Sequence, residues 1–196
     1  TLRVVVEDPE TIEAQLGLPV YATVPHSKSE LALDRRLKKG EGTGELLAVK
    51  FPEDDAVESL RSLRTTLHFA LLDAQQNSLL ITGSSPGLGK SFISKNLGAV
   101  LAQLGKRVVI IDADMRRGHI NKEFGLPRAM GVSEFVTGQA TLENILKPTS
   151  VPNLYVVTTG QIPPNPSELL MHSRFEELLK QLSEQFDNLI VDAPPV

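Results

Sequence analysis

The sequence predicts an α/β fold in which a mostly parallel sheet is flanked by helices. Short apolar segments alternate with helical ones along the chain, which is typical of strand–helix–strand units. The predicted strands, such as 79–82 and 107–111, contain continuous apolar runs, as expected for strands covered on both faces. A glycine-rich turn joins the first of them to a helix. With 196 residues, the chain is long enough to bury the core of one domain.

Composition excludes several classes of protein. The chain has 20 Lys+Arg against 24 Asp+Glu, and this net charge of −4 argues against a general nucleic-acid binder. It contains no cysteine, which excludes a disulfide scaffold, a thiolate zinc site and a cysteine nucleophile. No apolar run approaches the roughly 20 residues of a membrane-spanning helix. Because residue 1 is Thr and not Met, we expect a piece of a longer or processed protein.

The first 50 residues differ from the rest. Asp8–Glu10 places a capping carboxylate before Pro, which predicts a helix that runs to Leu16. The segment 19–25 is typical of a short strand closed by Pro. From 26 to 50 the charges are mixed and no periodicity emerges, which favours a linker.

We therefore expect an N-terminal segment and linker over 1–50, followed by a core over 51–196. Apolar residues at steps of three or four predict a long helix from Pro52; they are Val57, Leu60, Leu63, Leu67, Leu71 and Ala74. The remaining predicted core elements, in order, are strand 79–82, a helix ending at Gly105, strand 107–111, two or three short helices within 117–150, strand 154–157, helix 167–186 and strand 188–191.

The glycine-rich turn has the context of a phosphate-binding loop, with a strand before it and a helix after it. Gly87 and Gly89 let the backbone N–H groups point inward, Lys90 can neutralise phosphates, and the Ser91 hydroxyl can ligate Mg²⁺. The strict spacing asks for Gly where Ser84 stands, and a plain turn with a surface lysine is the alternative. The expected nucleotide-binding residues are Ser84, Ser85, Pro86, Gly87, Leu88, Gly89, Lys90, Ser91 and Phe92.

Acidic residues follow two other predicted strands. Asp112 and Asp114 project to the same side of an extended segment, which suits a metal ligand and a base. Alternatively, Asp112 caps the next helix and Asp114 pairs with Arg116. Asp192 ends another apolar strand, a weak signal on its own. Since the carboxyl ends of parallel strands share one sheet edge, we expect Asp112, Asp192 and Lys90 to converge there.

These three motifs, in this order, resemble the bacterial tyrosine autokinases of capsule and exopolysaccharide export. The resemblance covers the whole chain, including 8–25, 58–64 and the segment QIPPNPSELL at 161–170. It implies a P-loop NTPase-like fold of the deviant Walker type, in which the motifs are Walker A, A′ and B. It also implies ATP or ADP and Mg²⁺ as cofactors.

The resemblance further implies a protein-tyrosine kinase that transfers phosphate to tyrosines of a neighbouring subunit. In that interpretation Lys90 and Asp112 are catalytic, with Asp112 accepting the proton of the tyrosine hydroxyl. Ser91, Asp114 and Asp192 hold Mg²⁺. Such an enzyme would regulate polysaccharide polymerisation and export.

Residues 58–64 have the family's Glu-x-x-Arg-x-x-Arg form, so the resemblance also implies a ring-shaped homo-oligomer through Glu58, Arg61 and Arg64. The alternative is a solvated helix face with a weak Glu58–Arg61 pair. The family also implies the polysaccharide export machinery and a tyrosine phosphatase as partners, and no nucleic acid. The full-length protein would lie at the cytoplasmic face of the bacterial inner membrane, held by flanking segments outside this soluble piece, with 1–50 as its juxtamembrane part.

Three features depart from the family. Tyr21 and Tyr155 are the only tyrosines, so tail acceptors are absent. His119 stands where some relatives carry tyrosine, and the chain stops at Val196, which suggests a C-terminally incomplete core. One alternative function is a partition or division-type deviant Walker ATPase, although those carry a lysine at the place of Ser85. Another is an ATP-gated assembly scaffold.

Overall fold

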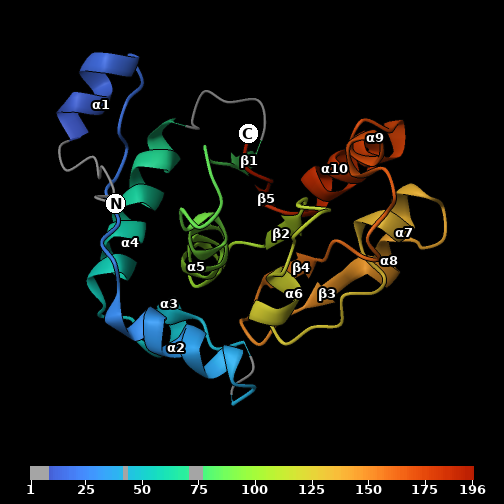
Figure 1. Cartoon of the computed structure of the whole chain (residues 1–196), viewed down its shortest axis with the longest axis horizontal. Coiled ribbons are helices and arrows are strands. Elements are labelled where there is room, and N and C mark those ends of the chain that lie inside the picture. Colours follow the sequence, from blue (N-terminus) through green and yellow to red (C-terminus); the bar gives the residue numbers. More distant parts are fainter. Residues whose placement is uncertain (1–8, 42–43, 71–76) are drawn as a thin grey trace.

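The computed structural model describes residues 9–41, 44–70 and 77–196. Its centre is a five-stranded sheet with the order β1-β5-β2-β4-β3 (Figure 1). Four strands are mutually parallel and β3 pairs antiparallel with β4. This arrangement confirms the predicted α/β fold with a mostly parallel sheet. The strands are β1 (Ser78–Ile81), β2 (Val108–Asp112), β3 (Leu146–Pro148), β4 (Leu154–Val157) and β5 (Asn188–Asp192).

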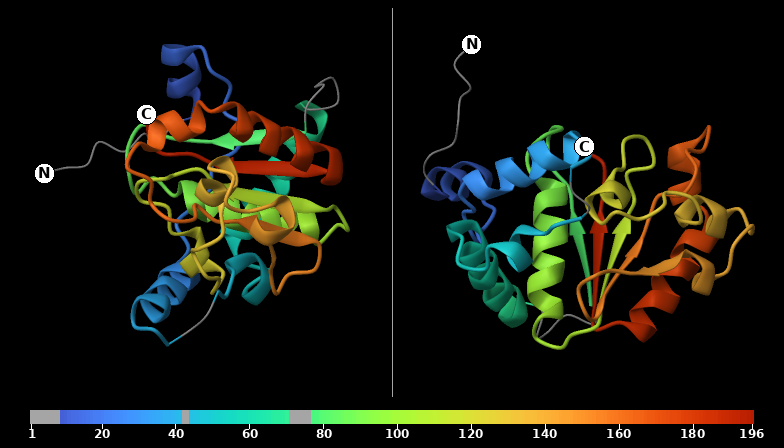
Figure 2. Two further views of the ribbon diagram at one scale, coloured as in Figure 1. Left: turned by 90° about the vertical axis from the view of Figure 1, so that its right-hand side faces the viewer. Right: turned by 90° about the horizontal axis from the view of Figure 1, so that it is seen from below.

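Helices cover both faces of the sheet (Figure 2). On one side lie α5 and α4, with α2 and α3 beside them, and on the other lie α7, α8 and α10. The helices are α1 (Pro9–Leu16), α2 (Lys28–Lys38), α3 (Leu47–Lys50), α4 (Asp55–Ala70), α5 (Lys90–Ala102), α6 (Ile120–Glu123), α7 (Val132–Val136), α8 (Leu142–Ile145), α9 (Pro166–Leu170) and α10 (Ser173–Gln185).

Alternate residues of each inner strand enter two separate cores. In β2, Val108 and Ile110 join the cluster under α5, whereas Val109 and Ile111 join the cluster under α10. Every residue of β2 is buried, as a continuous apolar run predicts. The edge strand β1 differs, because Leu80 is 63% exposed.

The N-terminal region contains more helix than the sequence predicted. Helix α1 is confirmed, although Asp8 lies outside the described residues. The segment 19–25 forms no strand, and a proline at each end deprives it of ladder donors. The expected linker 26–50 contains α2 and α3: Ser27 Oγ caps α2 by accepting from Glu30 N at 3.0 Å, and Leu47 is fully buried in the core. Tertiary packing, which local periodicity does not report, stabilises these helices.

Two further differences concern the core. The expected helix over 167–186 is divided into α9 and α10, and the Nδ1 atom of His172 starts α10 by accepting from the N–H of Arg174 at 3.2 Å. The strand β3 was not predicted because three residues carry no periodic signal. The predicted stripe on α4 is confirmed from Val57 to Leu67, and its last members, Leu71 and Ala74, lie outside the described residues.

None of the helices in the described ranges combines the length and the apolar character that crossing a membrane requires. The boundary between 1–50 and 51–196 stays a prediction.

Candidate active site

The sheet brings the three motifs together at its carboxyl edge. Asp112 and Asp192 are register partners on the neighbouring strands β2 and β5, and Ile81 at the end of β1 is the partner of Asp192 on its other side. Figure 2 (right) shows the ends of these strands side by side, with the loop before α5 above them. The predicted convergence is therefore confirmed.

The loop between β1 and α5 is shaped by two glycines. Gly87 has a φ of 79° and Gly89 a φ of 91°, a backbone conformation that side chains disfavour, and an added Cβ would meet no atom within 4 Å at either place. Among the described residues, the backbone N–H groups of Ser84, Ser85, Gly87 and Gly89 donate no hydrogen bond to the chain, whereas Pro86 has no N–H and 86–87 form a turn. Gly89 is the N-cap residue of α5 and, having no side chain, makes no capping hydrogen bond to the helix. The loop thus presents free donors and a helix N-terminus, which suits an anion.

Residues after β5 hold the base of this loop. The Thr82 hydroxyl donates to the carbonyl of Pro194 at 2.9 Å, and the N–H of Val196 donates to the carbonyl of Gly83 at 3.0 Å. The loop and the acidic end of β5 are thereby fixed to each other.

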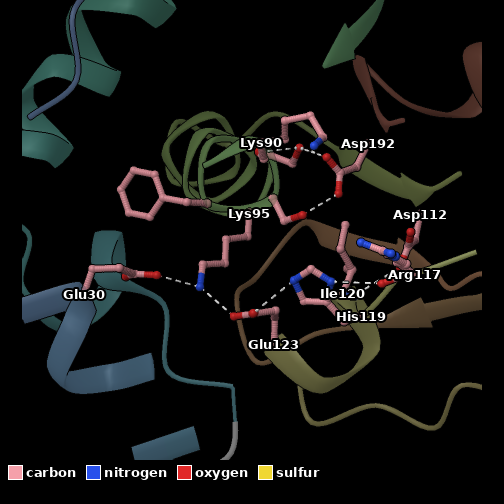
Figure 3. A network of polar contacts seen from close by, with 12 residues as sticks. Glu30, Lys90, Lys95, Asp112, Arg117, His119, Ile120, Glu123 and Asp192 are labelled. Atoms are coloured by element: carbon pink, nitrogen blue, oxygen red, sulfur yellow. Dashed lines mark hydrogen bonds and ion pairs between the residues drawn. The ribbon is translucent and has the colours of Figure 1, made fainter. Parts of the chain in front are cut away.

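Two serines of α5 bind the carboxylate of Asp192 (Figure 3). Ser91 Oγ donates to Oδ2 at 2.7 Å and Ser94 Oγ donates to Oδ1 at 3.0 Å. Asp192 is only 3% exposed, and burial raises its pKa above the ordinary value, while the two serine hydrogen bonds and the charges of Lys90 and His119 act in the opposite direction. Ser94 was missed by the sequence analysis; its position one helical turn after Ser91 is the signal that could have found it.

Asp112 is still more enclosed, at 1% exposure. Its Oδ1 accepts from the N–H of Asp114 at 3.2 Å and its Oδ2 from the N–H of Ile120, the first residue of α6, at 3.1 Å. Burial raises the pKa of Asp112 to about 7, against the hydrogen bond from Ile120. A carboxyl group with this pKa can exchange a proton near neutral pH.

Asp114 shapes the turn after β2. Its Oδ1 accepts from the backbone N–H groups of Arg116 at 3.2 Å and Arg117 at 2.9 Å. The predicted alternative of a side-chain pair with Arg116 is not found; the carboxylate binds the backbone. The other alternative, that Asp112 caps a helix, is compatible with the bond to Ile120 and does not exclude chemistry at the same group.

Gly118 is a part of the site that the sequence analysis missed. A Cβ at this position would lie 2.5 and 2.6 Å from the two Asp112 carboxylate oxygens and 2.4 Å from Cγ2 of Thr159. The Gly118 carbonyl also accepts from Nη2 of Arg128 at 3.1 Å. Only glycine leaves room for the carboxylate here, and a single sequence gives no sign of that contact.

The remaining predicted residues fall into two groups. Lys90 lies at the start of α5, close enough to Asp192 to affect its pKa (Figure 3). The Phe92 side chain packs against the hydrophobic core, so only its backbone in the first helical turn is available for a phosphate. On α4, Arg61 Nη1 donates to Glu58 Oε2 at 3.0 Å, which is the pair expected in the alternative of a solvated helix face. Arg64 is half-buried.

In the part of the chain that the structure describes, no cluster of three or more His, Cys, Asp or Glu side chains is placed to hold a metal ion. A hydroxyl and a carboxylate do meet at Ser91 and Asp192. Mg²⁺ in nucleotide sites typically takes one or two carboxylates and completes its octahedron with water and phosphate oxygens, so this sparse set of oxygens fits it.

The chain is similar both to a family of P-loop NTPases and to known tyrosine kinases. A family model described as ParA, the NUBPL iron-transfer P-loop NTPases, matches residues 74–196. The tyrosine-protein kinase ptk of Acinetobacter johnsonii is 49% identical over 195 residues, which cover 100% of this chain and 26% of that protein. The chain thus spans about a quarter of the length of the curated relatives it matches.

Solved structures extend the match to three dimensions. The BceF tyrosine kinase domain has a TM-score of 0.90 and 44% identity, covering 97% of this chain and 77% of that one. The kinase domain of the Escherichia coli tyrosine kinase ETK has a TM-score of 0.88 and 43% identity, covering 97% of this chain and 73% of that one. The chain therefore belongs to the bacterial tyrosine-protein kinases, a family built on the ParA-type P-loop NTPase fold.

Proposed function

We propose that this chain is the catalytic part of an ATP-dependent protein-tyrosine kinase. One observation carries the proposal: the hydroxyl of Ser91, at the end of the open phosphate loop, lies 2.7 Å from the Asp192 carboxylate, and Asp192 is the register partner of Asp112. A donor-rich loop, a pair of Mg²⁺-type oxygens and a carboxyl group with a raised pKa are the parts that phosphoryl transfer requires. The 44% identity to the BceF kinase domain supports the same activity.

The loop Ser84–Ser91 and the first turn of α5 would hold the phosphates of ATP. Their backbone N–H groups donate to the phosphate oxygens, and the Lys90 ammonium neutralises negative charge on the transferred group. Ser91 and Asp192, with Asp114 nearby, would hold Mg²⁺. Mg²⁺ held by these oxygens would supply positive charge to offset the negative charge of the phosphates.

Asp112 would serve as the general base. The acceptor tyrosine hydroxyl has an ordinary pKa near 10 and is a weak nucleophile at neutral pH. Its proton would pass to a carboxylate oxygen of Asp112 while the hydroxyl oxygen attacks the γ-phosphorus and the bond to ADP breaks. The raised pKa of Asp112, about 7, makes the proton transfer more favourable than to an ordinary aspartate.

For the full-length protein we propose a homo-oligomeric ring at the cytoplasmic face of the bacterial inner membrane, regulating polysaccharide export. Glu58, Arg61 and Arg64 on α4 would contact the neighbouring subunit, since Glu58 is exposed on α4. Residues 1–50 would be the juxtamembrane segment and 51–196 the kinase core. The export machinery and a tyrosine phosphatase are the proposed partners.

The test is incubation of the chain with labelled ATP, Mg²⁺ and an added tyrosine-rich peptide, with Lys90→Met as the control. Phosphotyrosine on the peptide supports the kinase. Free phosphate without phosphotyrosine favours a partition-type ATPase, and nucleotide binding without turnover favours an assembly scaffold. Either of these two results would overturn the proposal.

A further inference from the structure

Three helices meet at a buried lysine that the proposed mechanism does not use. Lys95 lies one turn after Ser91 on α5, and its side chain is 5% exposed. Its Nζ lies 2.7 Å from Glu30 Oε1 on α2 and 2.6 Å from Glu123 Oε2 on α6. Figure 3 shows the Lys95 side chain pointing away from Lys90 and Asp192, between the carboxylates of Glu30 and Glu123.

The charge state of this cluster follows from its surroundings. Burial acts to lower the pKa of Lys95, but the adjacent Glu123 and Glu30 carboxylates more than reverse this effect, so its pKa is raised and the lysine is charged. The buried Glu30 Oε2 has no hydrogen-bond partner within the described ranges. The Glu30 carboxylate is therefore held in place by Lys95 through its other oxygen.

Such a cluster is a poor source of stability, because removing three charged groups from water offsets most of their attraction. An apolar side chain of similar size would fill the same space at lower cost. What the ion pairs add is specificity of position, because they fix α2, α5 and α6 relative to one another at Lys95.

The α6 helix leads directly to Asp112. It is only four residues long: Glu123 is its last residue, and Ile120 is its first, whose N–H donates to Asp112 Oδ2. Because α6 is so short, the contact at Glu123 and the contact at Asp112 move together. The N-terminal region reaches the same helix a second time, since Gly44 packs against the backbone of Phe124 so closely that an added Cβ would lie 2.8 Å from its carbonyl carbon.

We propose that Lys95 is a positioning residue for the phosphoryl transfer: with Glu123 it holds α6 so that Ile120 orients Asp112, and Glu30 makes this placement depend on the docking of α2. The inference rests on the proposed role of Asp112 as the base. It makes the segment before the phosphate loop a structural determinant of the acidic half of the site.

The test compares Glu123→Gln, which removes the charge but retains size and an acceptor, with Glu177→Gln. Glu177 on α10 is exposed and its Oε1 accepts from Nε2 of Gln181 at 2.9 Å, so the same substitution there is a matched control away from the three helices. For Glu123→Gln we expect kcat for the added peptide to fall about tenfold and the KM for ATP to change less than twofold, because misplacing a catalytic group affects the transition state and not nucleotide binding. Glu30→Gln should act in the same direction, by about threefold.

Backbone amide exchange of residues 118–124, measured without nucleotide, supplies a readout that is independent of activity. It should accelerate about tenfold in Glu123→Gln and remain at the wild-type rate in Glu177→Gln. Lys95→Arg, which retains the charge, should recover more activity than Lys95→Met. A kinase with wild-type kcat and exchange in Glu123→Gln would overturn the inference, as would equal losses of ATP affinity and kcat.

Asp112→Asn, measured in the same series, separates the two proposals. If Asp112→Asn remains fully active, the proposed base is wrong. If Asp112→Asn is inactive while Glu123→Gln behaves as wild type in both kcat and exchange, the base stands and the positioning role of Lys95 fails.

Discussion

The two halves of the candidate site differ in how much of their hydrogen bonding is already complete. In the phosphate loop, 84–89, all residues but the half-buried Gly89 are exposed, and the N–H groups of Ser84, Ser85, Gly87 and Gly89 are free within the described residues. Asp112 and Asp192, by contrast, are almost fully buried and each accepts two hydrogen bonds from the chain. The open half is suited to gain a ligand, and the closed half is suited to hold catalytic groups in place. We therefore expect mutations in the first to affect nucleotide binding and mutations in the second to affect turnover.

Lys90→Met changes the open half of the site, the phosphate loop, and should have the largest effect on phosphotransfer. Loss of the ammonium leaves phosphate charge uncompensated both in the ground state and in the transition state, so phosphotransfer should fall by at least about 10³-fold and nucleotide binding should weaken. Labelled-ATP transfer and titration with a fluorescent ATP analogue measure the two effects. Full turnover in this variant would refute the assignment of the loop.

Asp112→Asn changes the closed half of the site, which contains the buried carboxylates. Removing a general base should lower phosphotransfer by about 10²-fold, while the dissociation constant for ATP stays within about twofold. The same two measurements apply, so the ratio of the two losses distinguishes this variant from Lys90→Met. Unchanged phosphorylation would remove Asp112 as the base.

The raised pKa of Asp112 also predicts how stability depends on pH. Between the unfolded pKa near 4 and the folded value of about 7, the folded protein holds a proton that the unfolded chain has lost. Stability is therefore lost as pH rises through this window. Urea unfolding without nucleotide should show wild type losing about 2–3 kcal/mol more than Asp112→Asn between pH 5 and pH 8. Parallel pH profiles for the two proteins would contradict the burial of a shifted carboxyl group.

Gly118→Ala tests whether the closed half tolerates a small displacement. The new Cβ would lie 2.5 Å from an Asp112 oxygen, so the carboxylate or the turn must move. We expect about tenfold lower kcat and about 1–3 kcal/mol lower stability, with ATP affinity retained. Gly118 does not have a positive φ, so the expected loss comes from the close contact and not from backbone strain. Wild-type kinetics in Gly118→Ala would show that Asp112 need not be held in this position.

The smallest effect on the single chain is expected from Arg61→Ala with Arg64→Ala. The Glu58–Arg61 pair is solvent-exposed on one side and contributes only a few tenths of a kcal/mol to α4. Folding and intrinsic ATP binding should persist, whereas any ring should shift towards monomers in light scattering. An unchanged assembly size would reject the proposed interface.

Local sequence signals predicted the parts of the site that lie along the chain. Gly87, Gly89 and Lys90 sit in one loop, and Asp112 and Asp192 end apolar strands, so spacing and sheet topology were enough to bring them together. Contacts through space were beyond such reasoning. Nothing near Gly118 in the sequence reveals the carboxylate against it, and nothing near Lys95 reveals its two partners.

The same distinction explains the N-terminal errors. The α2 helix has a capping serine but weak apolar periodicity, and it forms because Leu33 and Glu30 face the rest of the protein. Periodicity measures the preference of a segment on its own, and here tertiary contacts decide the structure.

The exposed Leu80 on the edge strand β1 has a practical consequence for studies of assembly. A sheet edge that carries an outward leucine is a template on which a second polypeptide can add a strand, which drives non-native association. Light scattering of the isolated chain is therefore best performed on a Leu80→Lys background. The charge discourages edge-to-edge aggregation and leaves the α4 surface unaltered, so that this source of non-native association is removed from the measurement.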